Sequence, residues 1–182
     1  MSRCSAALLL AALIAAHAGS APAASDIAAG EYQIKAAYLH HFAQFVEWPQ
    51  SVLPPGAPIV IGLVGDDPFG RAIDEIAGKH ANGHPLVIRH LRWNDPLGGC
   101  QMIFISSSEL DHLGAILLAV RGFSLLTVAD VDNFTERGGM IELMTVQHRV
   151  LFDINTEAAA EGHMKISSKL LQIARAVRGT TE

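Results

Sequence analysis

The stretch "IVIGLVGDDP" at residues 59–68 decides the fold class of this chain. Its first seven residues are glycines and apolar, mostly β-branched side chains, which predicts a strand buried on both faces of a sheet. An acidic pair and a proline follow, and these residue types suit the cap and the first position of a helix. We therefore expect a strand, a tight turn and a helix of about three turns ending near Gly78, which is half of a βαβ unit.

The same alternation continues along the middle of the chain. Hydrophobic patterns predict strands at 84–93, 101–106 and 124–130, with a helix over about 108–121 between the last two. Ser106 and Glu109 have the spacing of a capping box at the start of that helix. Residues 140–155 differ, because two strand-like runs meet there at Gln147 and His148, a pattern typical of a β-hairpin.

Helices are predicted at both ends of this region. Residues 26–48 form the first, which Pro49 ends, and "TEAAAEGH" at 156–163 and "SSKLLQIARAVRG" at 167–179 follow the hairpin. The apolar arc of the first helix consists of Ile34, Tyr38, Leu39, Phe42, Phe45 and Val46. The predicted fold class is α/β: a three-layer α/β/α sandwich on a mixed, mainly parallel sheet with a late β-hairpin.

Lys35 projects into the apolar arc of the first helix. A core-facing lysine must extend its ammonium group to the surface or find a partner for its charge. Two interpretations stay open: the side chain reaches solvent from the early turns, or it forms a buried ion pair with a carboxylate such as Asp153 or contacts a ligand.

Residues 1–24 have the features of a secretory signal peptide. A positive start with Arg3 precedes the apolar run "AALLLAALIAA" at 6–16, and small residues then allow cleavage after Ala23 or Ala24. The run is too short to span a bilayer comfortably. We expect an exported protein in which residues 25–182 form a single domain without a transmembrane segment.

The balance of charged residues and the number of cysteines exclude nucleic-acid binding and an internal disulfide. The chain has 13 basic and 18 acidic residues, and no basic cluster is dense enough to indicate nucleic-acid binding. Cleavage would remove Cys4 and leave Cys100 alone, so the mature chain cannot form an internal disulfide. Cys100 is then either a buried, inert thiol or a residue that pairs between chains.

Candidate sites for chemistry are sparse. Asp66, Asp67 and Ser107 follow buried strands at the carboxyl edge of the sheet, where open α/β sheets bind ligands, although helix capping is the simpler interpretation of the aspartates. Only His80 and His84 flank a loop that could clip a metal, and a third ligand is not evident. We predict no catalytic residue, no metal site and no cofactor.

Five segments of the mature chain resemble successive motifs of one family. They are "IKAAYLHHFAQFVEWP" (34–49), "IVIGLVGDDPFG" (59–70), "CQMIFISSSE" (100–109), "GGMIELMTVQHRVLFDIN" (138–155) and "KISSKLLQIARAV" (165–177). Together and in this order they are similar to the YfiR family of exported proteins, typically from Gram-negative bacteria. Under this resemblance the first segment is a packing helix that docks on the sheet, without chemistry of its own.

The resemblance implies regulation, not catalysis. A member of this family is a periplasmic repressor that binds the periplasmic sensor region of an inner-membrane diguanylate cyclase, and an OmpA-type outer-membrane lipoprotein can sequester it, which raises cyclic-di-GMP and biofilm growth. Family members tend to form homodimers and are associated with disulfide-based redox control. This chain departs from the last property, because Cys100 lacks a partner cysteine.

A partner could dock on three predicted surfaces. The hairpin turn offers His148 and Arg149, and the segment that opens the final helix offers Met164 and Leu171, residue types that suit an interface. The polar arc of the first helix, with His40, Gln44 and Glu47, is the third surface.

The leading hypothesis is therefore a periplasmic protein-binding repressor of a diguanylate cyclase. The alternative is a periplasmic small-molecule-binding module that feeds a membrane sensor such as a histidine kinase, with its ligand near Asp66, Asp67 and Ser107. An enzyme ranks third, because no acid–base pair stands out in the sequence.

Overall fold

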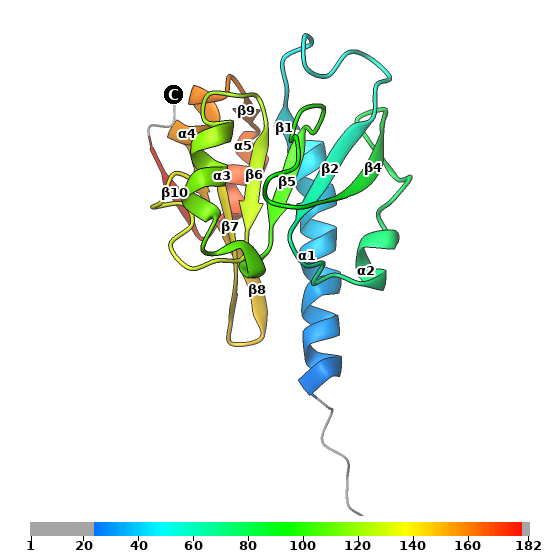
Figure 1. The fold of residues 1–182 in the computed structure, drawn as a ribbon, viewed down its shortest axis with the longest axis vertical. Coiled ribbons are helices and arrows are strands. Elements are labelled where there is room, and N and C mark those ends of the chain that lie inside the picture. The colour runs from blue at the N-terminus through cyan, green and yellow to red at the C-terminus, as the bar shows by residue number, and fades with distance from the viewer. Residues whose placement is uncertain (1–23, 180–182) are drawn as a thin grey trace, which may run out of the picture.

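Residues 24–179, which the computed structural model describes, form a mixed eight-stranded sheet with helices on both faces (Figure 1). The predicted signal peptide lies outside this range except for Ala24. In chain order the elements are α1 (Ala24–Phe45), β1 (Val46–Glu47), β2 (Ile59–Val64), α2 (Arg71–Asp74), β3 (His80–Ala81), β4 (His84–Leu91), β5 (Met102–Ile105), the 3-10 helix η1 (Ser107–Glu109), α3 (Leu113–Val120), β6 (Leu126–Ala129), β7 (Ile141–Val146), β8 (Arg149–Asn155), α4 (Thr156–Glu161), β9 (Lys165–Ile166), α5 (Ser168–Ile173) and β10 (Ala176–Arg178).

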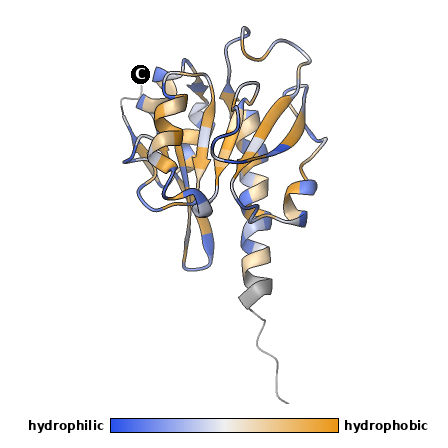
Figure 2. Ribbon diagram, in the orientation of Figure 1, coloured by the Kyte–Doolittle hydropathy of each residue, from blue (hydrophilic) through white to orange (hydrophobic). Residues whose placement is uncertain are grey.

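The strand order confirms the predicted mixed, mainly parallel sheet. The order is β10-β8-β7-β6-β5-β2-β4-β3, and the neighbours from β7 to β4 are all parallel. Antiparallel pairing occurs in the β7–β8 hairpin and between β3 and β4. Parallel strands with both faces covered are mostly apolar. This explains why β5 and β6 are buried at every position, and Figure 2 shows the strong hydropathy of the strands at the centre.

Two apolar clusters on opposite faces of the sheet make up the core. The larger cluster holds α1, α2 and α5 against one face, and the smaller one holds α3 against the other. Successive strand residues alternate between them: Phe104 belongs to the first cluster, and Ile103 and Ile105 belong to the second. Figure 1 shows the two layers, with α3 in front of the sheet and α1 behind it.

The helix α1 is the packing element that the sequence predicts. Leu39 and Phe42 are fully buried, and the Phe42 ring packs edge-on against Phe152 of β8 at 5.3 Å between centroids. Burying each such side chain contributes about 1.5–3 kcal/mol. The expectation for Ile34 is wrong: it is 47% exposed, and Lys35 is buried beside it. After the helix, the Trp48 indole closes the edge of the core and donates to the Gln101 carbonyl at 2.9 Å.

Three helices predicted before the hairpin end early or are split in the structure, and the first of them ends at Phe45 and not at Trp48, because Val46 and Glu47 pair with β9 as β1. The helix after β2 ends at Asp74 and not near Gly78, because the chain turns at Gly78 (φ 76°) to form β3. The helix expected over 108–121 is split into η1 and α3. The predicted capping residue Ser106 does cap η1, since its hydroxyl accepts from the Ser108 amide at 3.4 Å.

The prediction of the final helix is wrong in its second half. It ends at Ile173, and the chain then runs as β10, parallel to β8. The edge of β8 offers unpaired backbone groups, which an added strand satisfies, and the Arg175 amide begins this pairing by donating to the Phe152 carbonyl at 2.8 Å. In a continuous helix Ile173 and Val177 would share a face with the buried Leu170, but they are 63% and 37% exposed.

Within residues 24–179, no helix combines the length and the apolar character that crossing a bilayer requires.

Candidate functional site

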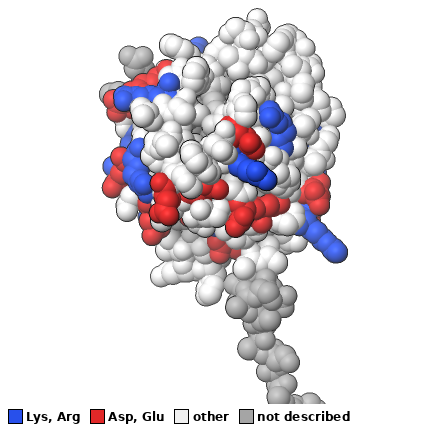
Figure 3. All heavy atoms as spheres, in the orientation of Figure 1, with Lys and Arg blue, Asp and Glu red and all other residues white. Residues whose placement is uncertain are grey.

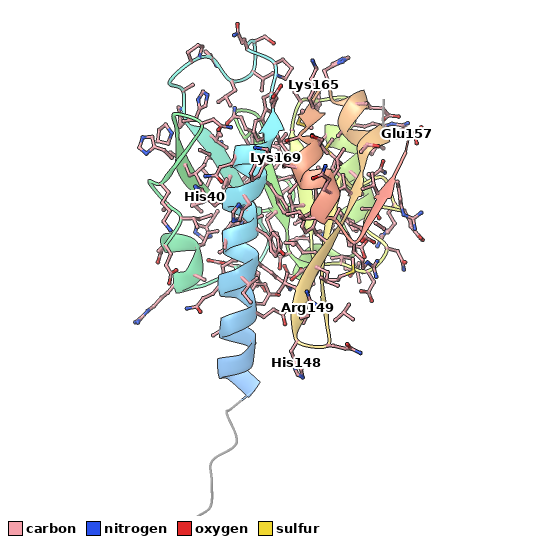
Figure 4. All side chains as sticks on the ribbon, turned by 180° about the vertical axis from the view of Figure 1, so that it is seen from behind. His40, His148, Arg149, Glu157, Lys165 and Lys169 are labelled. Atoms are coloured by element: carbon pink, nitrogen blue, oxygen red, sulfur yellow. The ribbon has the colours of Figure 1, made fainter. Side chains whose placement is uncertain are left out.

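The β7–β8 hairpin carries the first predicted docking surface to one end of the molecule. Its two-residue turn consists of Gln147 and His148, both with positive φ (50° and 61°), the conformation that matches the twist of a tight hairpin. His148 and Arg149 are exposed there, and the neighbouring Val146 is 42% exposed. Figure 4 shows His148 at the tip of the hairpin, which extends past the body of the sheet.

The second predicted surface does not join the first. Figure 4 places Lys165, which belongs to this segment, at the other end of the molecule from His148. Met164 is only 4% exposed and belongs to the large core cluster. The prediction that it is an exposed docking residue is therefore wrong. Its segment turns inward because β9 pairs with β1. Leu171 is half-buried against the same cluster.

At the predicted ligand edge, the loops contact one another. The Asp66 amide donates to the Ser108 hydroxyl at 2.9 Å, and Asp67 Oδ1 accepts from the Phe69 and Gly70 amides at 2.7 and 3.3 Å. Asp67 thus caps the turn that leads to α2, as the simpler interpretation holds. Asp66, Asp67 and Ser107 are exposed, and they line none of the three cavities described below.

Lys35 forms the buried ion pair that its sequence position suggests, but with a different carboxylate. Its ammonium lies 2.7 Å from Asp130 Oδ2 and 2.6 Å from Glu31 Oε1 on the preceding turn. The Tyr32 hydroxyl also donates to Asp130 Oδ2, at 2.8 Å. Burial, and then this hydrogen bond to a carboxylate, raise the pKa of Tyr32 above its usual range, so the phenol remains a neutral donor.

Asp153, the partner proposed for Lys35, instead forms a bidentate pair with Arg175. Arg175 Nε donates to Asp153 Oδ1 at 2.8 Å, and Nη2 donates to Oδ2. Asp153 lies opposite Glu142 in the hairpin register. Glu142 is buried too, and it accepts from the Asn133 and Thr135 amides at 3.1 and 3.2 Å. Backbone amides and a guanidinium therefore balance the two adjacent carboxylates.

Sequence reasoning missed the residues around Lys35, above all Asp130. It directly follows the buried strand β6, as Asp66 follows β2, so the rule that selected Asp66 and Asp67 also selects Asp130. What the sequence cannot show is that α1 lies across this strand end. Figure 3 shows acidic side chains gathered across the lower part of the front face, toward the end where α1 begins.

Three cavities are described in this structure. The largest, of about 660 Å³, lies between α3 and the loop before β5; it is mostly apolar, and Trp93, Cys100 and Phe123 are among its lining residues. Trp93 stacks on His112 at its rim, with 4.2 Å between ring centroids. The second, of about 510 Å³, lies between α3 and α4. The third is a polar cavity of about 480 Å³ beside Lys35 and Asp130.

Cys100 is a free, buried thiol, as one of the two sequence-based interpretations holds. Burial raises the pKa of this thiol, and the nearby Arg89 charge opposes that change without reversing it. His84 contacts the Ala57 carbonyl, at 2.8 Å from its Nδ1. In the part of the chain that the structure describes, no three His, Cys, Asp or Glu side chains are grouped to hold a metal ion.

Comparisons with known proteins complete this description. No curated protein matches the chain. A crystal structure of a conserved domain protein from Vibrio cholerae O1 biovar eltor str. N16961 is similar in fold, with a TM-score of 0.55 and 14% identity over 81% of this chain. The match covers 60% of that protein, so the chain spans less than two thirds of its length. The sequence model of the family described as YfiR/HmsC-like matches residues 32–175, and this chain therefore belongs to the YfiR/HmsC-like family.

Proposed function

We propose that this protein is a non-enzymatic periplasmic regulator that binds and represses the periplasmic sensor region of an inner-membrane diguanylate cyclase, and so lowers cyclic-di-GMP. Membership of the YfiR/HmsC-like family implies a periplasmic regulator of cyclic-di-GMP signalling, without catalysis. In this proposal residues 1–24 are a signal peptide cleaved near Ala23 or Ala24, and residues 25–182 are one exported domain.

The projecting β7–β8 hairpin is the observation that supports this docking site. Its two-residue turn holds His148 and Arg149 away from the core, on a pair of strands anchored by six register partners. Arginine is one of the residue types that most often dominate the binding energy of protein interfaces, and Arg149 is exposed on this hairpin. Leu171, half-buried on another side of the molecule, is a weaker candidate for the same role.

Cyclic-di-GMP in the native host tests this proposal. Deletion of the gene should raise cyclic-di-GMP, and an exported copy should reverse the rise while a copy without residues 1–24 should not. Full reversal by the leaderless copy would contradict a periplasmic site of action. An unchanged level after deletion would contradict repression of a cyclase.

A charge reversal tests the docking surface separately. Arg149→Glu in the exported copy should abolish complementation, because it places a carboxylate where we expect the partner to offer a complementary charge. Lys79→Glu is the matched control: Lys79 is also exposed, but it directly precedes β3, at the opposite edge of the sheet from the hairpin strands, so its reversal should complement fully. Equal behaviour of the two variants, at equal protein levels, would exclude the hairpin.

Two further partners belong to the same proposal. An OmpA-type outer-membrane lipoprotein would compete with the cyclase for the protein, and a homodimer would form through exposed apolar side chains near α3. Leu118 and Phe123 are 75% and 62% exposed there. Sedimentation of wild type against Leu118→Glu tests the dimer: a dimeric wild type and a monomeric variant are expected.

A small-molecule-binding module that feeds a sensor such as a histidine kinase is the second candidate. The cavity of about 660 Å³ between α3 and the loop before β5 favours it, because its size and apolar lining are those of small-molecule sites. A saturable change in tryptophan fluorescence on adding a small aromatic solute, lost in Trp93→Phe, would support this function.

A further inference from the structure

The polar cavity of about 480 Å³ lies at the carboxyl edge of the sheet, beside α1, the residues after β6 and the β7 half of the hairpin. The charged residues that line it are Glu31, Lys35, Asp130, Asp132, Glu142 and Arg175. Met144 and Thr145 of the hairpin line it too. The cavity is separate from the apolar cavity near α3 and from the exposed tip at His148.

Asp130 provides the evidence that this cavity receives a ligand. Its side chain is 7% exposed, and Oδ2 accepts from both Lys35 and Tyr32. The other oxygen, Oδ1, is buried without a hydrogen-bond partner among the described residues. Leaving a buried carboxylate oxygen without a donor is costly, and the great majority of buried polar atoms have a partner.

The charges around the cavity select the sign of that ligand. Four carboxylates line it against two cations. Lys35 is already shared by Glu31 and Asp130, and Arg175 is held by Asp153, which lies outside the lining. An entering cation therefore gains attraction from groups that are not yet neutralised, whereas an anion would be repelled.

We propose that this cavity binds a small organic cation through an ammonium or guanidinium group that donates to Asp130. The terminal torsion of aspartate is broad, so a modest rotation turns Oδ1 toward the donor while Oδ2 keeps Lys35 and Tyr32. Asp132, which is exposed, attracts the cation at the entrance. The aliphatic part of the ligand lies against Met144 and Val146. This inference does not depend on the proposed repression of a cyclase.

Backbone amide NMR of the purified protein, at constant ionic strength, tests the proposal with three probes that share a butyl chain. Butylammonium and butylguanidinium should shift the amides of residues 130–133 and 142–146 saturably, and neutral butylurea should not. Equal binding of butylurea, saturation at other residues, or the absence of any saturable shift would overturn the proposal.

Asp130→Asn should weaken butylguanidinium binding about tenfold or more, because a charged acceptor becomes a neutral one. Asp111→Asn is the matched control, since it removes the same charge from an exposed loop away from the cavity. Asp130 also holds Lys35, so Asp132→Asn provides a second variant that leaves the buried network intact. It should weaken binding about threefold. If both Asp130→Asn and Asp132→Asn bind as wild type does, the cavity is not the site.

Discussion

Lys35 Nζ lies 2.7 Å from Asp130 Oδ2, although 95 residues separate them in the chain. This pair joins the helix α1 to the end of the central strand β6, and both side chains are more than nine-tenths buried. Such a pair is costly to break, because removal of one partner leaves an uncompensated charge in the interior. It places a strongly polar network inside the molecule, next to the hairpin that we propose as the docking site.

Lys35→Met should lower the free energy of unfolding by about 3 kcal/mol, because Asp130 then loses its countercharge. Lys165→Met, at an exposed lysine, should change it by less than about 0.5 kcal/mol. In a double-mutant cycle, Asp130→Asn should cost at least about 1 kcal/mol less in the Lys35→Met background than alone. Urea unfolding of wild type and of these four variants measures these values, and strict additivity in the cycle would show that Lys35 and Asp130 do not couple.

Glu31 makes stability fall in acid. Burial by itself would raise the pKa of its carboxyl, but hydrogen bonds from Lys35 and Thr145 and the Lys35 charge bring it below the ordinary value of 4.5. Because the folded pKa lies below the unfolded one, the stabilisation is complete above the unfolded pKa and is lost as pH falls through the folded pKa. Urea midpoints of Glu31→Gln should therefore depend less on pH below about pH 4.5 than those of wild type. Glu157→Gln, at an exposed glutamate, should keep the wild-type slope.

Cys100 should behave as an inert thiol. Its burial and its raised pKa disfavour the reactive thiolate, so a thiol reagent should modify the native protein at least about a hundredfold more slowly than the unfolded protein. Reducing agent should leave the unfolding midpoint unchanged at all protein concentrations. A midpoint that drops with reductant would instead indicate a disulfide between two chains.

The backbone conformation of the hairpin turn at His148 lowers the stability of the fold. His148 has a φ of 61°, a conformation that glycine adopts without strain. His148→Gly should therefore raise the free energy of unfolding by about 0.5–1 kcal/mol. The same substitution at His40, inside α1, should lower it by about 1 kcal/mol, since glycine is a poor helix former. Thermal unfolding followed by circular dichroism measures both, and a loss of stability in both variants would contradict the proposed strain.

Much of the fold could be predicted from local patterns. The apolar runs that became β2, β5 and β6 have the composition of strands buried on both faces, and no other element satisfies that pattern at such short length. The hairpin at Gln147 and His148 was also readable, because two strand-like runs met at a short polar turn. Projection on a helix was enough to show that Lys35 faces the core.

Periodicity failed at the C-terminus for a physical reason. Residues 174–178 suit either a helix or a strand locally. The choice depends on the open edge of β8, which the local sequence of these residues does not report. The burial of Met164 has the same origin, because the pairing of β9 with β1 turns that segment inward. Arg175 then lies within reach of Asp153, so Asp153 was not free to pair with Lys35.

By itself, therefore, the sequence determined which segments form the central strands of the sheet, that an amphipathic helix covers it and that one lysine of that helix needs a partner. Only the tertiary structure decided which carboxylate is that partner and which carboxylate oxygen is left without a donor. Local patterns report the burial and the period of a segment, whereas ion pairs and cavities depend on which strand ends and helices meet in space. Asp130 illustrates both: the sequence predicts its position at the end of a buried strand, whereas only the tertiary structure shows its pairing with Lys35 and its Oδ1 without a donor.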